Sequence, residues 1–247
     1  MSGRLLVWRG TQPIGELWLA ADGNSMGFAY AEPRPGMAIS NSLPLSDSPF
    51  SAEQGLAHRW FANLLPEEGA RQALVRRLGV VDEDFALLAA IGGDCAGALS
   101  LLHNGKVPQS LSGMQPVDPE ELARWAEGRE RFALFEPGRN GATRLSLAGA
   151  QDKIPLLWHE GEWFLPQGDT PSSHLLKFSA NPALVLNELY MNRLAQAAGL
   201  PVPDSRVGRA GKALYLVVSR YDRSSGADGR MQRVHQEDFC QALGLPR

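Results

Sequence analysis

Three features of the sequence could together hold phosphate groups. The first is the run of small residues Ala148–Ala150, which lies between two apolar stretches. A loop without large side chains lets backbone N–H groups approach phosphate oxygens. The second is Lys177, a cation suited to the α and β phosphates of a nucleotide, and the third is Glu188, a carboxylate able to hold that lysine in place. The chemistry indicated is nucleotide binding.

Each feature also has an ordinary explanation when it is taken alone. Small residues serve any tight hairpin turn. Lys177 would be a lysine at a strand edge without a role in binding, and Glu188 would be a solvated helix residue. The decision between the two interpretations depends on the elements that carry these residues and on the order of those elements.

The second half of the chain predicts that order. Strands are expected at Thr143–Leu147, Lys153–Trp158, Glu162–Leu165, around Leu175–Phe178, Ser205–Arg209 and Ala213–Ser219, with helices at Ala183–Ala198 and Gln236–Leu243. Lys177 then points away from the side that Leu176 faces, and Gly199 ends the helix that contains Glu188. A hairpin with a small-residue loop, a lysine strand, a helix with an early glutamate and two further strands are typical of the nucleotide-binding lobe of a protein-kinase-like fold.

The first half is mixed in type. It predicts a hairpin of Leu5–Trp8 and Glu16–Ala20 around a turn with Pro13 and Gly15, a strand at Gly27–Tyr30, helices at Ser51–Leu65, Pro66–Leu78 and Asp82–Ala90, and a strand at Ala98–Leu102. A linker from Asn104 leads to a helix that Asp118 caps. The predicted fold class is therefore α+β, with an amino-terminal mixed sheet and helix subdomain at 1–110 and a kinase N-lobe-like subdomain at 111–247.

Composition excludes several classes of protein. With 247 residues, 44% hydrophobic and 21% charged, the chain predicts a folded protein and excludes disordered and fibrous classes. It shows no signal peptide and no apolar run of about 20 residues, so we expect a cytoplasmic protein without a membrane partner. Cys95 and Cys240 lack metal-ligand spacing, and no metal site is predicted. The net charge of −3 gives no argument by itself for nucleic acid.

Several separated motifs resemble one family. The stretches SLAGAQDKIPLL, SSHLLKF, NELYMNRLAQAAGLPVPDS, VSRYDR and HQEDFCQALGLP, and earlier LLPEEGARQAL and IGGDCAGALSL, resemble the HipA family of bacterial toxin kinases, in that order and over nearly the whole chain. The resemblance implies a serine/threonine kinase that phosphorylates an aminoacyl-tRNA synthetase, typically the glutamyl enzyme, and so inhibits translation. It also implies a HipB-like DNA-binding antitoxin as a partner, with DNA bound only indirectly through that antitoxin.

The same resemblance assigns roles to residues. It assigns Lys177 as the ATP lysine and Tyr221 as a ring that stacks on adenine. The phosphate loop is assigned to Ala148, Gly149, Ala150, Gln151, Asp152 and Lys153, and the connector that lies along adenine to Ser219, Arg220 and Tyr221. Ser146 matches the family's autophosphorylation site. A phosphate there would place a charge of about −2 near the triphosphate and repel it. Ser219 departs from the acidic residue of the family pattern, so only its backbone is expected to contribute.

The catalytic residues of a kinase are not found in this sequence. A catalytic-loop Asp, its Asn partner and a further Asp that holds Mg²⁺ should follow the connector, and no such motif follows SRYDR. We therefore expect an amino-terminal part of a HipA-like kinase that binds ATP, has its Mg²⁺ ligands in a missing lobe and is inactive alone. The alternatives are a non-catalytic binding module or half-kinase that acts with a separate partner subunit, and an unrelated ATP-using ligase.

Three further acids have no predicted catalytic role. Asp94 is expected either to form a turn or to help dock the two subdomains. Glu237 and Asp238 are expected at the start of the last helix, where acids interact well with the helix dipole.

Overall fold

The chain folds into two compact units. The fold is described from a computed structural model, which describes residues 3–33, 35–108, 113–127, 153–167, 170–226 and 231–246. The first unit comprises Met1–Ser110, Arg144–Ala150 and Arg233–Arg247, and the second comprises Leu111–Thr143 and Gln151–Gln232. The division at residue 110 that we proposed for the subdomains stays a prediction, but Arg233–Arg247 groups with the first unit and not with the second.

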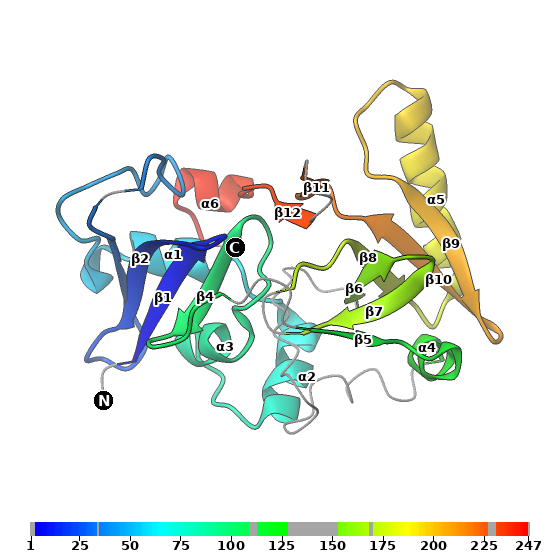
Figure 1. The fold of residues 1–247 in the computed structure, drawn as a ribbon, viewed down its shortest axis with the longest axis horizontal. Helices are drawn as coiled ribbons and strands as arrows, with labels where there is room; N and C mark the ends of the chain where they lie inside the picture. Colours follow the sequence, from blue (N-terminus) through cyan, green and yellow to red (C-terminus); the bar gives the residue numbers. More distant parts are fainter. Residues whose placement is uncertain are drawn as a thin grey trace. The chain divides into compact units, whose positions relative to one another are not determined.

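The first unit is built on a four-stranded antiparallel sheet. Its strands are β1 (Arg4–Arg9), β2 (Gln12–Leu19), β3 (Met26–Tyr30) and β4 (Leu99–His103), in the order β3-β2-β1-β4. The unit also contains the 3₁₀ turn η1 (Ala52–Gln54) and the helices α1 (Leu56–Ala62), α2 (Glu68–Leu78) and α3 (Asp84–Ile91), and Figure 1 labels the three helices. The ring centroids of Phe28 on β3 and Phe61 on α1 are 5.4 Å apart, which places α1 against the core side of the sheet.

The first hairpin turns earlier than predicted. The turn is at Gly10 and Thr11, and not at Pro13 and Gly15, which both lie within β2. Pro13 pairs with Trp8 beside a register shift in the ladder. A bulge of this kind accommodates a residue that has no N–H to donate, so proline did not mark the turn here.

Two predicted helix boundaries were also wrong. The helix expected over Ser51–Leu65 is interrupted at Gly55, whose φ of +66° ends η1 before α1 begins. The third helix has Glu83 at its N-cap and not Asp82. Asp82 instead accepts a hydrogen bond from Nε of Arg71 at 2.6 Å, which uses the carboxylate that would have capped the helix.

The last residues of the chain pack on the first unit. We call 233–246 the carboxy-terminal segment; it contains the short helix α6 (Phe239–Leu243). Gln241 donates to the carbonyl of Trp60 at 3.1 Å, and Arg59 donates to the carbonyl of Gly244 at 2.6 Å. The segment is therefore held on α1 by hydrogen bonds between residues about 180 positions apart.

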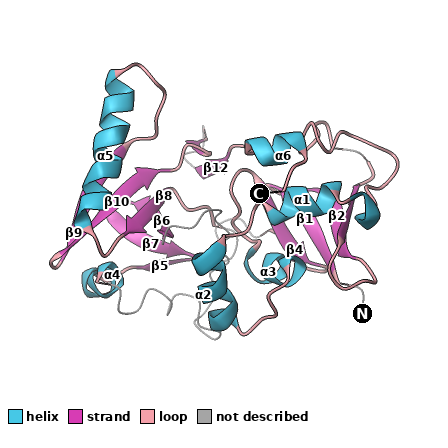
Figure 2. Ribbon diagram, turned by 180° about the vertical axis from the view of Figure 1, so that it is seen from behind, coloured by secondary structure: helices cyan, strands magenta, loops and turns pink. Residues whose placement is uncertain are grey.

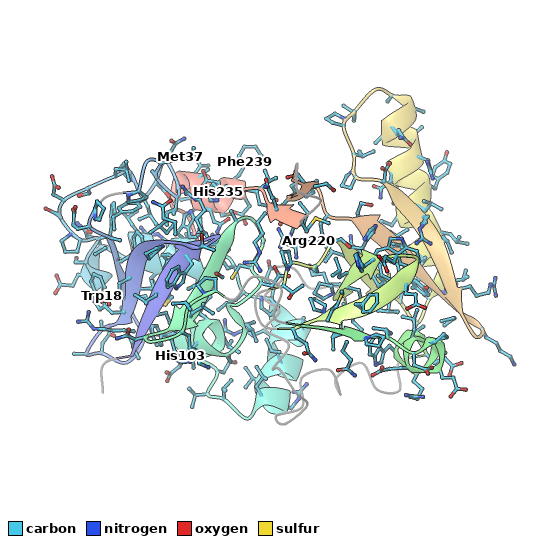
Figure 3. All side chains as sticks on the ribbon, in the orientation of Figure 1. Trp18, Met37, His103, Arg220, His235 and Phe239 are labelled. Atoms are coloured by element: carbon cyan, nitrogen blue, oxygen red, sulfur yellow. The ribbon has the colours of Figure 1, made fainter. Side chains whose placement is uncertain are left out.

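A second part of the same segment is held near β3 and β4. Arg233 forms an ion pair with the buried Asp94 at 3.1 Å, and Nε2 of His235 lies 2.7 Å from the carbonyl oxygen of Ile39. Figure 3 shows His235 next to the first unit and Phe239 on α6, where the Phe239 ring is 87% exposed. Asp94 and Arg233 belong to the same unit, so this ion pair does not decide between the two roles considered for Asp94, which stay predictions.

The helix in this segment starts later than predicted. It begins at Phe239, because Asp238 accepts a hydrogen bond from the N–H of Gln241 at 2.7 Å and so forms the N-cap. The prediction that Asp238 stands at the helix start is confirmed. Glu237 has a different partner, since its Oε2 accepts from the indole N–H of Trp60 at 3.1 Å.

The second unit contains a six-stranded antiparallel sheet in the order β5-β7-β6-β8-β10-β9. Its strands are β5 (Met114–Pro116), β6 (Lys153–His159), β7 (Glu162–Pro166), β8 (His174–Phe178), β9 (Ser205–Ala210) and β10 (Ala213–Ser219). Two helices complete the unit, α4 (Pro119–Ala126) and α5 (Pro182–Ala197). Figure 2, coloured by secondary structure, shows α5 beside β9 and β10 and α4 near β5. A small ladder of β11 (Arg223–Ser225) and β12 (Met231–Arg233) follows β10.

The two helices cover opposite faces of this sheet. Trp125 of α4 packs in one buried cluster with Leu176 and Val217, while Val185 of α5 packs with Leu216 and Val218 in another. Neighbouring residues of a strand point to opposite faces, so alternate positions of β10 serve the two clusters. The sheet thus has an α4 face and an α5 face.

One side of α5 is not covered within its unit. Five large apolar side chains of this helix are between 48% and 64% exposed: Leu184, Leu186, Tyr190, Met191 and Leu194. Val185 is its single fully buried residue among those described. We call these five residues the outer face of α5.

Candidate functional site

Lys177 lies on the α5 face of the sheet, as the last residue but one of β8. Its neighbours Leu176 and Phe178 point into the α4 face core, so strand alternation directs Lys177 to the other side, as predicted. There Nζ of Lys177 lies 2.5 Å from Oε1 of Glu188. The two side chains are 22% and 28% exposed, so this ion pair is half-buried and less screened than a surface pair.

The local structure of α5 explains the position of Glu188. Asn181 caps the helix by accepting from the N–H of Ala183 at 3.0 Å, and Pro182 fills the first helical position. From that fixed start, Val185 and Glu188 are three residues apart and lie on the same side of the helix. Val185 anchors that side on the sheet, and Glu188 therefore reaches Lys177.

A second lysine faces the same way. Lys153 of β6 is the direct ladder partner of Lys177 of β8. Directly opposite residues in an antiparallel pair project to the same face, and two like charges there are unfavourable unless anions balance them. Glu188 supplies one negative charge. The geometry of β6, β8 and α5 is thus suited to an anionic ligand such as a polyphosphate.

Part of the predicted site lies outside the described residues. This applies to Ser146 and to the loop residues Ala148, Gly149, Ala150, Gln151 and Asp152. Their roles, and the predicted strand Thr143–Leu147, stay predictions. Lys153, where the loop is expected to end, is the first residue of β6.

The connector after β10 has a buried side and an exposed side. The N–H groups of Ser219 and Arg220 donate to the carbonyls of Asp204 and Ser173, at 2.8 Å and 2.9 Å. Tyr221 is 70% exposed, so its ring face is accessible for stacking. The predicted role of this segment at adenine is untested, and it would have to use the exposed side.

The Arg220 side chain does not point to solvent. Figure 3 labels Arg220 beyond β10, and its guanidinium is buried, with Nε and Nη2 donating to the carboxylate of Asp222 at 2.9 Å and 2.6 Å. Nη1 donates to the Ser172 hydroxyl at 2.8 Å, and Arg223 donates to Asp222 at 2.8 Å. Sequence reasoning missed Asp222 and Arg223; their signal was the charge alternation in RYDR, which reads equally well as a solvated turn.

Two further searches covered the residues that the structure describes. Over the described ranges, no group of three or more His, Cys, Asp or Glu side chains could hold a metal ion. None of the helices in those ranges is long and apolar enough to cross a membrane.

Comparisons with known proteins place both units in one family. A model of the HipA N-terminal domain matches residues 5–102, and a model of the HipA-like C-terminal domain matches residues 145–247. A protein of Sinorhizobium fredii named "Putative kinase Y4mE" is 39% identical to the whole chain, which covers 60% of that protein. The serine/threonine-protein kinase toxin HipA of Shewanella oneidensis is 31% identical over 94% of the chain and 53% of the toxin.

A solved structure shares the fold. HipA of Shewanella oneidensis, in its complex with HipB and operator DNA, superposes with a TM-score of 0.80 and 31% identity over 98% of this chain. The chain covers 56% of that HipA, so it spans little more than half the length of the relatives it matches. The predicted α+β fold, with a kinase-like N-lobe after a mixed amino-terminal subdomain, is confirmed.

Two matched domains in the family's order, and a solved member of the same fold, show that the chain belongs to the HipA family of toxin kinases.

Proposed function

We propose that this chain supplies the ATP-binding part of a HipA-like serine/threonine kinase. The observation that carries the proposal is the Lys177–Glu188 ion pair on β8 and α5, with Lys153 directly across the ladder. Kinases use this arrangement to hold the α and β phosphates, with the helical carboxylate fixing the lysine. Lys153 and Lys177 project to the same face of the sheet, so both can contact the phosphates of one nucleotide.

Each residue of the site then has a stated task. Lys177 binds phosphate oxygens, Glu188 orients Lys177, and the loop Ala148–Asp152 with Lys153 binds phosphate through backbone N–H groups and one ammonium. The exposed side of Ser219–Tyr221 lies along adenine. ATP would supply the phosphoryl group that is transferred. We place the catalytic aspartate and the Mg²⁺ ligands in the part of the relatives that this chain does not span.

The proposals for substrate and partner rest on the resemblance to the family. We propose an aminoacyl-tRNA synthetase, typically the glutamyl enzyme, as the protein phosphorylated by the complete kinase, with inhibition of translation as the result. The solved relative was crystallised with HipB and operator DNA. A HipB-like antitoxin is accordingly the proposed partner, and DNA would be bound only through it.

ATP affinity of the Lys177→Ala variant tests the proposal. Calorimetric titration of the chain with ATP should give saturable binding, and Lys177→Ala should weaken it by about tenfold or more, since a charge-assisted contact to phosphate is lost. Lys212→Ala is the control, because Lys212 lies in the exposed turn between β9 and β10 of the same unit. Equal affinity of the two variants for ATP would contradict the proposal.

The predicted switch at Ser146 needs a protein that contains the catalytic lobe. In such a protein, incubation with ATP should add one phosphate at Ser146, detected by mass spectrometry, and phosphorylated protein should bind ATP more weakly because like charges repel. Ser146→Ala should keep its ATP affinity after the same incubation. If both forms lose affinity equally, Ser146 is not the switch.

A further inference from the structure

A pocket of about 230 Å³ opens at the end of the sheet of the second unit, where β9 begins and β10 ends. Its lining includes His174, Arg193, Asp204, Arg206, Val217 and Ser219, and we call it the back pocket. Sites for drug-sized ligands usually measure roughly 300–1,000 Å³, so this pocket suits a smaller chemical group.

The back pocket is separate from the proposed nucleotide site. Arg206 stands directly opposite Val217 in the β9–β10 ladder, and Val217 packs in the α4 face core. Directly opposite residues share a face, so Arg206 projects to the α4 face, whereas Lys177 projects to the α5 face. The other arginine, Arg193, belongs to α5 and reaches the pocket at the start of β9, where it donates to the carbonyl of Ser205. The two sites meet only at Ser219, which lines the pocket and begins the connector.

Both arginines of the pocket are held in place by groups other than carboxylates. The Arg193 guanidinium donates to the carbonyl of Ser205 and to Oε1 of Gln196, each at 3.2 Å. The Arg206 guanidinium lies 5.7 Å and 5.9 Å from the ring centroids of Trp158 and Trp163. These contacts position the two cations without neutralising them, and in the described part of the chain neither forms an ion pair.

The charge of the pocket favours an anion. Two guanidinium groups and one carboxylate, that of Asp204, line the pocket. Burial and the charge of Arg206 lower the pKa of His174, which disfavours the protonated form of its ring. A metal cation would find a single carboxylate and two repelling cations there, whereas Ca²⁺ needs about six to eight oxygen ligands.

We propose that the back pocket binds a compact oxyanion, a phosphoryl or carboxylate group, between the guanidiniums of Arg193 and Arg206. Guanidiniums bind such groups through parallel N–H donors, and their fixed positions reduce the ordering cost of binding. The bound group would rest against the start of β9 and the end of β10, directly behind the connector. The proposal does not depend on ATP binding at Lys177.

The test is an NMR titration of the chain with inorganic phosphate and, separately, with acetate at constant ionic strength. We expect saturable shifts of the backbone amides of Ser205, Arg206 and Ser219. Tighter binding of phosphate identifies a phosphoryl ligand, and tighter binding of acetate a carboxylate ligand. The titrations are repeated with Lys177→Ala, which should weaken phosphate binding at the nucleotide site and leave these shifts unchanged.

Variants of the two pocket arginines, with a control on the same strand as Arg206, decide the assignment. Arg206→Gln and Arg193→Gln should each weaken binding by about tenfold, because each removes a charged donor. Arg209→Gln, an exposed arginine of β9 on the opposite face, should leave the affinity unchanged. Unchanged unfolding temperatures would show that the variants are folded. Shifts that do not saturate, or that persist equally in the Arg206 and Arg193 variants, would overturn the proposal.

Discussion

Asp222 is a buried carboxylate with two guanidinium partners. It accepts from Arg220 and Arg223, and the side chains of the three residues are between 1% and 5% exposed. Burying charged groups costs their hydration free energy, and only a complete set of ion pairs and hydrogen bonds offsets that cost. The network fixes the turn after β10, and thus determines where the connector and Tyr221 lie.

Replacing Asp222 should therefore destabilise the second unit strongly. Asp222→Asn leaves two buried guanidiniums without their carboxylate, and we expect a loss of about 3 kcal/mol in the free energy of unfolding. Asp118→Asn is the matched control, since either residue can accept the hydrogen bond at the start of α4, and it should change stability by less than about 0.5 kcal/mol. Urea unfolding measures both, and equal losses would contradict the network's role.

Asp84 gives a pH dependence to the first unit. The hydrogen bond with His58 lowers the pKa of Asp84, burial opposes that effect, and the contact with Arg71 lowers the pKa further, so it lies below its ordinary value. A carboxylate with a lowered pKa stabilises the fold above its unfolded-state pKa of about 4 and loses that contribution as the pH falls through the folded-state pKa. Urea unfolding of Asp84→Asn should show lower stability at pH 7 and a shallower loss below about pH 4 than the unchanged protein; parallel curves would contradict this.

At the residue scale the sequence predicted contacts that depend on element order. Lys177 and Glu188 could be paired because strand alternation and helix spacing set their directions. The burial of Arg220 could not be predicted, because it depends on Ser172, which is 48 positions away in the sequence. No local pattern distinguishes that arginine from a solvated one.

At the element scale, Gly97 is where the turn before β4 meets the carboxy-terminal segment. Its φ is +77°, and a Cβ atom there would lie 3.0 Å from both the N and O atoms of Gln236. Because glycine has no side chain, it allows both the left-handed backbone conformation and the close approach of Gln236.

Gly97→Ala separates these two purposes when it is compared with Gly23→Ala. Gly23 has a φ of +74° with nothing within 4 Å of its Cβ position, so its substitution should cost only the backbone strain, about 1 kcal/mol. Gly97→Ala should cost at least about 2 kcal/mol, since the Gln236 backbone must also move. Thermal and urea unfolding measure the loss in the free energy of unfolding for each variant. Equal losses would show that the close contact between Gly97 and Gln236 does not add to the effect of the backbone strain.

The elements themselves were mostly predictable, with boundaries displaced where the local backbone geometry differed from the one that the residue type suggests. Gly55 divides the helix expected over Ser51–Leu65, and Pro13 lies within β2 beside a register shift in its ladder with β1. Asn181 and Pro182 at the start of α5, by contrast, gave a helix start close to the predicted one, because capping is local.

At the scale of the whole molecule, the first unit is made from both ends of the chain. Residues 233–246 complete it through Asp94, Ile39, Trp60 and Arg59. Neither periodicity nor local motifs could predict this, because the sequence order places the segment after the second unit. The family resemblance gave the order of the motifs but not their packing.

A chain ending at Gln232 should show the consequence. Without the segment, backbone amides of β1 and β4 should exchange with solvent faster, because α1 loses its hydrogen-bonded neighbour. Amides of β8 and β10 should keep their exchange rates, since those strands belong to the second unit. Hydrogen exchange followed by mass spectrometry tests both expectations, and unchanged protection of β1 and β4 would contradict them.

The outer face of α5 has a consequence for the handling of this chain in solution. Leu186, Tyr190 and Leu194 follow one another at four-residue intervals and form an apolar strip that water wets poorly. Purified chain should therefore be retained on a phenyl column, increase the fluorescence of a dye such as ANS, and precipitate at low ammonium sulfate concentrations. Introducing charge through Leu186→Glu and Leu194→Glu should reduce the column retention, the ANS fluorescence and the precipitation by salt. The variant should then stay monomeric at concentrations at which the unaltered protein self-associates.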